Sequence, residues 1–478
     1  MTIKEVVRRT VPSLFVSLRT IKYKVLMEYR VLRRLSVSGL LKAVIGHQEP
    51  WQKLLPFQLP LRFHGHAEPG ADLLTAIAGD AHVAHGGHAV YLPPLVWCAS
   101  ALAPLAASYP DDAGLKVIRT SGSVADGQYL SETVPAGKLH RQAHYGHQHL
   151  ALVANVLHIF GLTPRVYDLV EIEYGGRVWV AYVVKHAPGS LPGAAVYEPG
   201  IERIRELTRQ GILRLIVPDG FDHPDFRPPF NDNVRTDAQD NFQYVDFQNF
   251  TLENHERFIR RVADEAANAT HFGDHSVVRG KYLYQSIPGF GRAGKRDIVS
   301  RLQLMEGMMA EAGVTVRDRV VLDVGCNVGM MMAQYLARGA AWCHGWDQPI
   351  VVPHTEKLML SLGCTRFSLT GAPLQRSRPL IEDLPPFLRT RLDGCVMSYL
   401  AIQGHIGWLD SVRDIPWSFM LYEGHEYEDA AKADDILNEL MHLVPGTRVA
   451  TRRTVRDGDS DPRIVAIITR EHASSDGR

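Results

Sequence analysis

Short apolar runs alternate with segments of helical spacing over the last third of the chain. Each run predicts a buried strand, and together they occupy residues 320–324, 342–347, 365–370, 392–400 and 417–422. Helical spacing follows the first run from Met330 to Arg338 and recurs from Asp434 to Leu443. Alternation of this kind is typical of a parallel sheet with helices on both faces. Segments 447–455 and 463–469 predict a terminal hairpin, so we expect an α/β domain over residues 299–478.

The middle of the chain, residues 60–255, mixes strand-like and helical patterns. Two runs of strand character, 165–172 and 177–184, flank the pair Gly175-Gly176. Glycines between two such runs predict a hairpin, because a tight turn needs residues that tolerate positive φ. Helical spacing is found at residues 144–160 and 201–214. We therefore expect a separate α+β domain here.

Residues 256–298 join these two parts of the chain. Between Lys281 and Arg296 the segment carries several tyrosine and phenylalanine side chains among glycines and cations, more aromatic than a plain linker needs to be. We expect it to act as a lid or substrate contact over a pocket of the last domain, followed by a helix from Arg296 to Ala312.

The first 48 residues are basic, with ten Lys or Arg against the two acids Glu5 and Glu28. Apolar residues recur at helical spacing on one face, and most of the cations fall on the sides and back. This pattern predicts an amphipathic leader helix. Such a helix can lie on an anionic membrane surface, and the alternative is a helix docked on its own domain or on a second copy.

Composition narrows the classes of protein further. At 478 residues the chain is long enough for two or three domains, and its formal net charge is zero. Zero charge gives no general attraction to nucleic acid. The five cysteines are few, odd in number and without C-x-x-C spacing, which favours reduced thiols, a cytoplasmic location and no zinc site.

The most informative motif follows the strand that ends at Asp323. It reads Asp323-Val324-Gly325-Cys326-Asn327-Val328-Gly329, and the next strand ends in Asp347. Glycines let a ligand approach the backbone, and an acid after the second strand can accept the hydroxyls of a ribose. The spacing lacks the G-x-G-x-x-G of dinucleotide folds. It resembles the D-x-G-x-[GN]-x-G loop of class I S-adenosylmethionine (SAM) methyltransferases, with Asn327 as the variant position.

This resemblance implies a Rossmann-like seven-stranded methyltransferase sheet and a SAM cofactor. The family usually places an acid directly after the third strand, where Thr370-Gly371 stands here. Asp383 comes later in the chain and is the remaining candidate near the adenine. The cofactor contacts implied by the resemblance are Asp323, Gly325, Cys326, Asn327, Gly329, Asp347 and Asp383.

Acceptor chemistry points to the ends of the fourth and fifth strands, because ligands of open α/β sheets bind at the carboxyl ends of strands. A hydroxyl acceptor needs a proton acceptor near its oxygen, and an imidazole suits that role. His405 follows the fourth strand, and His425 follows the fifth. We expect His405 first, then His425, to be the catalytic base, with Glu423 orienting either one.

A second motif lies in the middle region. His223-Pro224-Asp225-Phe226-Arg227-Pro228 resembles the catalytic loop of protein kinases, with Asn233 and then Asp246-Phe247 in the following positions. That resemblance implies an α+β kinase-like domain in which Asp225 orients a hydroxyl nucleophile. Asn233 and Asp246 would hold Mg²⁺ on the phosphates of ATP. The best candidate for the phosphate-contacting lysine is Lys116 or Arg119, and a kinase-like fold used only for binding is the alternative.

These patterns together predict a SAM-dependent methyltransferase with a kinase-like domain before it. The pair of domains resembles, in reversed order, bacterial enzymes that terminate polysaccharide chains at the inner membrane face. The expected acceptor is a glycan, a lipid-linked sugar or a small molecule, and the protein is expected to be cytoplasmic with peripheral membrane contact through the leader. Two alternatives stay open: an RNA methyltransferase with a nucleic-acid module, which the neutral charge disfavours, and a non-catalytic scaffold that binds SAM.

Overall fold

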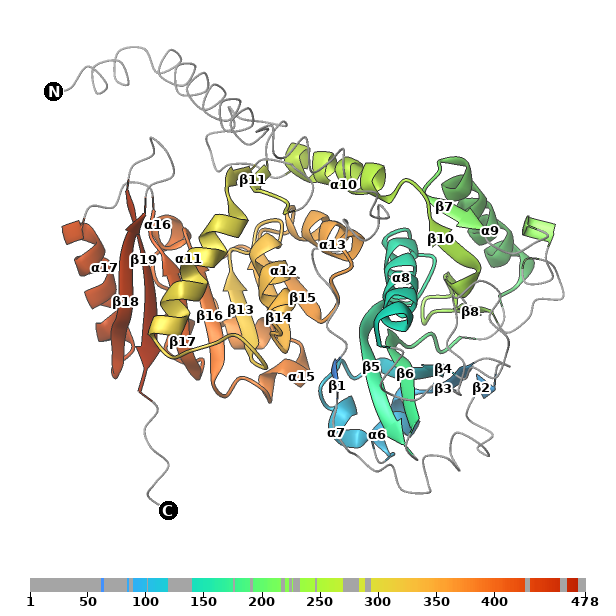
Figure 1. Cartoon of the computed structure of the whole chain (residues 1–478), viewed down its shortest axis with the longest axis horizontal. Helices are drawn as coiled ribbons and strands as arrows, with labels where there is room; N and C mark the ends of the chain where they lie inside the picture. Colours follow the sequence, from blue (N-terminus) through green and yellow to red (C-terminus); the bar gives the residue numbers. More distant parts are fainter. Residues whose placement is uncertain are drawn as a thin grey trace, which may run out of the picture.

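The computed structural model describes residues 62–63, 84–85, 89–100, 102–118, 140–174, 177–189, 192–215, 220–222, 226, 233–245, 247–269, 283–288, 294–425, 430–455 and 462–471. The leader predicted at residues 1–48 lies outside them, as do Asp225 and Asp246. Figure 1 shows an amino-terminal half (described residues up to 269) beside a carboxyl-terminal half (described residues from 283). Within the described residues, no helix is long and apolar enough to cross a membrane.

The carboxyl-terminal half is built on a seven-stranded sheet of order β15-β14-β13-β16-β17-β19-β18. The first five strands in this order run parallel, and β19 is antiparallel to both of its neighbours. This order fits the Rossmann-like methyltransferase sheet that the sequence predicted. The strands are β13 Val320–Val324, β14 Trp342–Asp347, β15 Phe367–Gly371, β16 Cys395–Leu400, β17 Trp417–Glu423, β18 Thr447–Val455 and β19 Arg463–Arg470.

Helices cover both faces of this sheet, because successive strand residues point to opposite sides. Val321 and Leu421 pack in one apolar cluster with α11, α12 and α13, while Leu322 and Met420 pack in a second cluster with α15 and α17. The helices of this half are α11 Ile298–Glu311, α12 Met330–Ala337, α13 Val352–Ser361, α14 Leu380–Asp383, α15 Pro386–Arg389, α16 Gln403–Ile406, the 3₁₀ turn η6 Asp410–Val412 and α17 Ala430–Leu443.

A six-stranded sheet of order β1-β5-β6-β4-β3-β2 forms the centre of the amino-terminal half. Its pairs are antiparallel except at the edge, where β1 runs parallel to β5. The predicted hairpin is β5–β6, and the predicted helix 144–160 corresponds to α8, which begins and ends slightly earlier. The elements are β1 Arg62–Phe63, β2 Ala84–His85, β3 Ala89–Leu92, α6 Pro94–Cys98, α7 Ala103–Ala106, β4 Ala113–Ile118, α8 His140–Ile159, β5 Val166–Tyr174 and β6 Arg177–Lys185.

Smaller elements complete this half and lead into the next. The helix predicted at 201–214 is α9, which begins and ends earlier, at Ala194–Arg209. It ends because Gly211, with φ of +65°, provides the left-handed residue that commonly follows a helix. The remaining elements are β7 Leu213–Leu215, η2 Gly220–Asp222, β8 Val234–Thr236, β9 Phe242–Tyr244, η4 Phe247–Asn249, β10 Phe250–Leu252, α10 His255–Ala269, β11 Leu283–Gln285 and β12 Gly294–Arg296.

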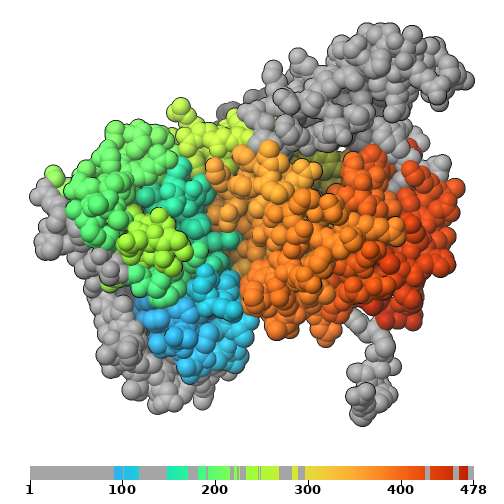
Figure 2. Space-filling model, turned by 180° about the vertical axis from the view of Figure 1, so that it is seen from behind, coloured from blue at the N-terminus to red at the C-terminus, as the bar shows by residue number. Residues whose placement is uncertain are grey.

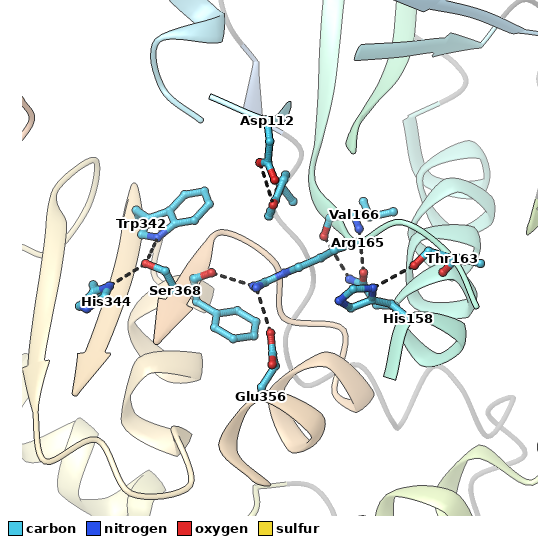
Figure 3. A network of polar contacts seen from close by, with 12 residues as sticks. Asp112, His158, Thr163, Arg165, Val166, Trp342, His344, Glu356 and Ser368 are labelled. Carbon is cyan, nitrogen blue, oxygen red and sulfur yellow. Dashed lines mark hydrogen bonds and ion pairs between the residues drawn. The ribbon is translucent and has the colours of Figure 1, made fainter. Parts of the chain in front are cut away.

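The two halves meet over a broad contact, visible from behind in Figure 2. Helices α8 and α10 both pack on α13. Figure 3 shows Arg165 at this contact, where its guanidinium donates to the carbonyl of Phe367 at 2.7 Å and to Glu356 at 3.2 Å. The backbone N–H of Arg366 donates to the carbonyl of Tyr167 at 2.9 Å. Hydrogen bonds between the halves therefore use backbone as well as side-chain groups.

A buried ion pair lies at the same contact. Asp168 is 1% exposed and Arg366 is 2% exposed, and the Arg366 Nε lies 3.7 Å from the Asp168 carboxylate. Tyr109 donates its hydroxyl to the same carboxylate at 2.8 Å. Buried charges cost free energy unless they are paired, so this pair fixes how β5 of one half lies against the strand β15 that follows Arg366.

Candidate cofactor-binding site

The loop after β13 has the backbone conformation that its glycines predict. The φ angles are +76° at Gly325, +52° at Asn327 and +77° at Gly329, all in the left-handed region. A Cβ on Gly329 would lie 2.5 Å from the Met359 sulfur, and one on Gly325 would lie 3.0 Å from the Ile402 side chain. Glycine is therefore required at both positions, whereas asparagine tolerates this region better than most residues.

Asp347 lies beside this loop, as the sequence predicted. Its Oδ2 accepts a hydrogen bond from the Asn327 N–H at 2.7 Å, and its Oδ1 accepts one from the Gln348 N–H at 2.7 Å. Burial raises the pKa of this carboxyl group, although the two backbone donors act in the opposite direction. Each carboxylate oxygen has more than one lone pair, so Asp347 keeps capacity to accept hydroxyl donors of a ligand.

Two polar side chains hold the loop from either side. The Gln285 amide on β11 accepts from the Met330 N–H at 2.9 Å and donates to the Cys326 carbonyl at 3.4 Å. Thr355 on α13 donates its hydroxyl to the Asn327 carbonyl. Gln285 therefore caps the start of α12, where backbone N–H groups lack helical partners. No role had been predicted for either residue, apart from the place of Gln285 in the aromatic segment 281–296.

Cys326 lies inside the loop and is fully buried. Burial raises the pKa of its thiol well above the ordinary value, so the side chain is neutral at physiological pH. A neutral buried thiol behaves as a small apolar side chain. Its contribution to a cofactor site is therefore packing, with its backbone carbonyl fixed by Gln285.

Asp323 lies under the loop rather than on its surface. It is 3% exposed, and it accepts a hydrogen bond from the Ser398 hydroxyl at 2.6 Å. Burial raises the pKa of this carboxyl group to about 7, and the Ser398 donor only partly offsets that effect. The Tyr335 hydroxyl also contacts Ser398, at 3.2 Å. Asp323 thus joins the ends of β13 and β16 below the loop.

The raised pKa of Asp323 predicts how stability depends on pH. The pKa of this carboxyl is about 7 in the folded protein and about 3.9 in the unfolded chain. Its contribution to the free energy of unfolding is therefore fully present at low pH, where the group is protonated in both states. This contribution is lost as pH rises from about 4 through about 7. We expect Asp323→Asn to flatten this part of the stability profile and to be less destabilised than the wild type on going from pH 5 to pH 8. Melting temperatures of both proteins over that range test the point, and parallel profiles contradict it.

The two histidines chosen from the sequence lie together at the carboxyl edge of the sheet. His405 is on α16 and exposed, and His425 follows β17. Their ring centroids are 4.9 Å apart and nearly perpendicular. Glu423 is 0% exposed and pairs with Arg301 and Arg463. The structure thus gives this carboxylate two arginine partners, and its role in orienting a histidine stays a prediction.

Asp383 lies near the end of β15, which is the edge that the adenine prediction requires. Its carboxylate receives two hydrogen bonds from the Arg378 guanidinium, at 2.5 and 2.8 Å. Thr370 donates its hydroxyl to the Asp383 carbonyl at 3.1 Å. A contact between Asp383 and adenine stays a prediction.

The metal-binding prediction for the amino-terminal half, Asn233 with Asp246, stays a prediction. Asn233 is described, and its carbonyl accepts the N–H of Val245 at 2.7 Å. Asp246 and the proposed catalytic Asp225 lie outside the described residues. Within the part of the chain that the structure describes, no group of three or more histidine, cysteine or acidic side chains could hold a metal ion.

The residues of the glycine loop fit a SAM molecule. The loop glycines leave the backbone open to close approach, and the Asp347 carboxylate can accept ribose hydroxyls. The amide oxygen Oδ1 of Asn327 is buried without a hydrogen-bond partner among the described residues. A buried acceptor of this kind is rare in a complete site, so it marks a place where a ligand donor fits.

Comparison with known proteins gives structural likeness alone. No protein-family model and no curated protein matches the chain. A putative RNA methyltransferase from Pyrococcus horikoshii is similar at 13% identity over 45% of this chain and 98% of that chain, with a TM-score of 0.28. A ribosomal protein L11 methylase from Lactobacillus delbrueckii subsp. bulgaricus is similar at 19% identity over 36% and 80%, with a TM-score of 0.24.

A further likeness is to magnesium protoporphyrin IX methyltransferase from Synechocystis PCC 6803, solved with bound SAH. The identity is 12% over 36% of this chain and 83% of that chain, and the TM-score is 0.25. The methyltransferase-type fold of the carboxyl-terminal half rests on its sheet order and on the geometry of the glycine loop.

Asp347→Ala is expected to weaken SAM binding, because the ribose hydroxyls lose their carboxylate partner inside a largely buried site. The loss should be about 1–3 kcal/mol, or roughly 5- to 150-fold in Kd. Isothermal titration calorimetry measures it directly. Asp435→Ala, an exposed acid on α17, serves as the control and should bind SAM as the wild type does. If Asp347→Ala and the control bind SAM with equal affinity, Asp347 is not the acceptor of the ribose hydroxyls.

Proposed function

We propose that the chain is a SAM-dependent methyltransferase. The observation that carries the proposal is the contact between the Asp347 carboxylate and the Asn327 N–H, at 2.7 Å, inside a loop with two left-handed glycines. This brings the glycine turn and the acid of the next strand to one place at the carboxyl edge of a parallel sheet. That edge is where open α/β sheets bind nucleosides.

When bound, SAM would supply a methyl carbon on a positively charged sulfur, so that a bond from an acceptor oxygen to this carbon could form as the carbon–sulfur bond breaks and S-adenosylhomocysteine (SAH) leaves. The chain's own residues then have two tasks. Asp347 and the glycine loop hold the nucleoside, and the loop is itself held by Gln285 and Thr355. A base must take the proton of an acceptor hydroxyl, and His405, exposed at the edge beside His425, suits this role.

The acceptor that we propose is a hydroxyl of a glycan, of a lipid-linked sugar or of a small molecule, methylated in the cytoplasm or at the inner membrane face. The imidazole pair at the site, of which His405 is exposed, supports a hydroxyl acceptor, because the hydroxyl proton needs a nearby base. An RNA acceptor and a non-catalytic scaffold are the competing functions.

Transfer of labelled methyl groups from SAM into fractionated cell extract tests this function. The proposal expects label in a glycan, lipid or small-molecule fraction, and less of it when Asp347→Ala replaces the wild type. Label in RNA, removed by ribonuclease, would favour the RNA methyltransferase. SAM binding without any transfer would favour the scaffold.

A second proposal concerns the amino-terminal half, which we infer binds ATP and Mg²⁺. One described contact favours it: the Lys116 Nζ on β4 donates to the Val245 carbonyl at 2.9 Å and lies 5.0 Å from the centre of the Phe247 ring. In protein kinases a lysine contacts the phosphates of ATP close to the metal-binding acid, and Lys116 contacts the two neighbours of the proposed acid in the sequence. Asp246 lies between these two contacts in the sequence.

Magnesium-dependent binding of a fluorescent ATP analogue tests the second proposal. Lys116→Met should weaken such binding at least tenfold, and Lys185→Met, a lysine with an exposed side chain at the end of β6, is the control. Absence of nucleotide binding in the wild type would end the proposal and leave the methyltransferase function unaffected.

A further inference from the structure

Three arginines surround one carboxylate at the carboxyl edge of the methyltransferase-type sheet. Arg301 on α11 and Arg463 at the start of β19 both contact the Glu423 carboxylate at the end of β17, the latter at 2.5 Å. Arg296, at the end of β12, also acts on Glu423. The three arginines are 3–7% exposed, and Glu423 is 0% exposed. We call Arg296, Arg301, Arg463 and Glu423 the arginine cluster.

The arginines dominate the electrostatics of the arginine cluster. Burial would raise the pKa of Glu423, but Arg301, Arg463 and Arg296 outweigh it and lower the pKa. The nearby Tyr284 responds in the same way, since Arg296 and Arg301 lower the pKa of its hydroxyl against the effect of burial. The guanidinium groups therefore act on both acidic groups of this region, and guanidinium groups are well suited to hold anionic oxygens.

Two buried polar atoms of the cluster point to a ligand. The Oε2 of Glu423 and the Nε of Arg301 have no hydrogen-bond partner among the described residues. Groups of this kind are normally satisfied. A ligand with both an anionic oxygen and a hydroxyl would satisfy the guanidinium and the carboxylate together.

The cluster is continuous with the proposed site. Tyr284 precedes Gln285, whose amide holds the glycine loop, and His425 lies two residues after Glu423. The cofactor loop follows β13, whereas Glu423 ends β17, two strands away in the sheet. At ordinary strand spacing this separation is roughly 10 Å. The cluster therefore lies to one side of the cofactor, on the same side as the histidine pair.

From this arrangement we infer that the arginine cluster binds an anionic group, a phosphate or a carboxylate, of the methyl acceptor. Guanidinium groups recognise both anions through paired N–H donors. The inference rests on the proposed methyltransferase function and adds the chemical class of the substrate. Arg296 is the best position to test, because replacement of Arg296 leaves the ion pairs of Glu423 with Arg301 and Arg463 in place.

The first experiment measures thermal stabilisation of the full chain by sodium phosphate, against NaCl of equal ionic strength. The cluster should give the wild type a phosphate-dependent shift, since a ligand that binds only the folded state raises its melting temperature. In Arg296→Gln the apparent Kd for phosphate should rise at least tenfold, and Arg296→Lys should restore part of the affinity. Arg376→Gln, at an exposed arginine paired with Asp410, is the matched control.

Repeating the titration with saturating SAH or with 5′-methylthioadenosine separates the two sources of the anion. The inference expects the phosphate shift to persist with both. If SAH abolishes the shift and 5′-methylthioadenosine does not, the cluster holds the cofactor's own carboxylate and the inference is overturned. If phosphate gives no shift beyond NaCl, carboxylates of the chain itself balance the arginines and the inference is again overturned.

The second experiment asks whether the labelled product is an anion. Product from the extract assay should be retained on an anion-exchange resin and released by salt, and Arg296→Gln should raise the KM for that fraction more than it lowers kcat. Label that passes through the resin uncharged contradicts the inference. Failure of the wild type to bind SAM would instead remove the proposed function, while the phosphate titration without cofactor would still report on the cluster.

Discussion

Glu423→Ala is expected to lower the free energy of unfolding by about 3–5 kcal/mol, the usual loss when one partner of a buried ion pair is removed. Glu423 is completely buried, and its carboxylate contacts both Arg301 and Arg463. Its removal leaves buried guanidinium groups without this counter-charge. The same change should tilt α11 and the start of β19 away from the end of β17, because the carboxylate is their common contact.

Urea denaturation followed by circular dichroism tests this loss. Glu439→Ala, at an exposed position of α17, is the matched control and should change stability little. A loss below about 1 kcal/mol at Glu423 would mean that the three groups are not a buried ion-pair network.

Gly329→Ala is expected to destabilise the carboxyl-terminal half by about 2–4 kcal/mol, through backbone strain and overpacking together. The φ of Gly329 is +77°, and an added Cβ would lie 2.5 Å from the Met359 sulfur and 2.9 Å from the Thr355 methyl group. Relief of these contacts requires movement of α13 or of the start of α12. SAM affinity should fall together with stability, because Gly329 lies in the same loop as Asn327, whose N–H donates to Asp347.

Gly307→Ala provides the opposite expectation on the same half. Gly307 lies in α11, and nothing surrounds an added Cβ within 4 Å. Alanine there should stabilise the helix by about 0.5–1 kcal/mol. Thermal melts of the two variants should therefore move in opposite directions, and equal shifts contradict the steric account of Gly329.

The strands of the carboxyl-terminal half could be predicted because their signal is local. Runs such as 320–324 are apolar on both faces, which suits strands covered by helices on both sides. The turn from Gly325 to Gly329 could also be predicted, since only a few residue types adopt left-handed φ. The position of Asp347 beside it followed from the parallel order of β13 and β14.

The supports of the site could not be predicted, because they come from distant segments. Gln285 lies 41 residues from Cys326 in the sequence, and Arg301 lies 122 residues from Glu423. Neither distance leaves a periodic or spacing signal. Glu423 was chosen as an orienting acid from its place after the fifth strand, but its ion pairs depend on side chains from α11 and β19.

The contact between the two halves could not be predicted from the sequence either. In the sequence, Asp168 and Arg366 are ordinary polar positions in or next to strand-like runs. Only the structure shows that both are buried at one interface. The end of α9 was misplaced because apolar residues continue past Gly211 into β7, so helical periodicity and strand character overlap there.

Calorimetric titration of SAM into the full chain tests the central claim most directly. The structure predicts saturable binding of one SAM per chain, competed by SAH and weakened in Asp347→Ala but not in Asp435→Ala. A folded wild type that takes up no SAM, or one whose affinity is indifferent to residue 347, would contradict the assignment of this loop as a SAM site.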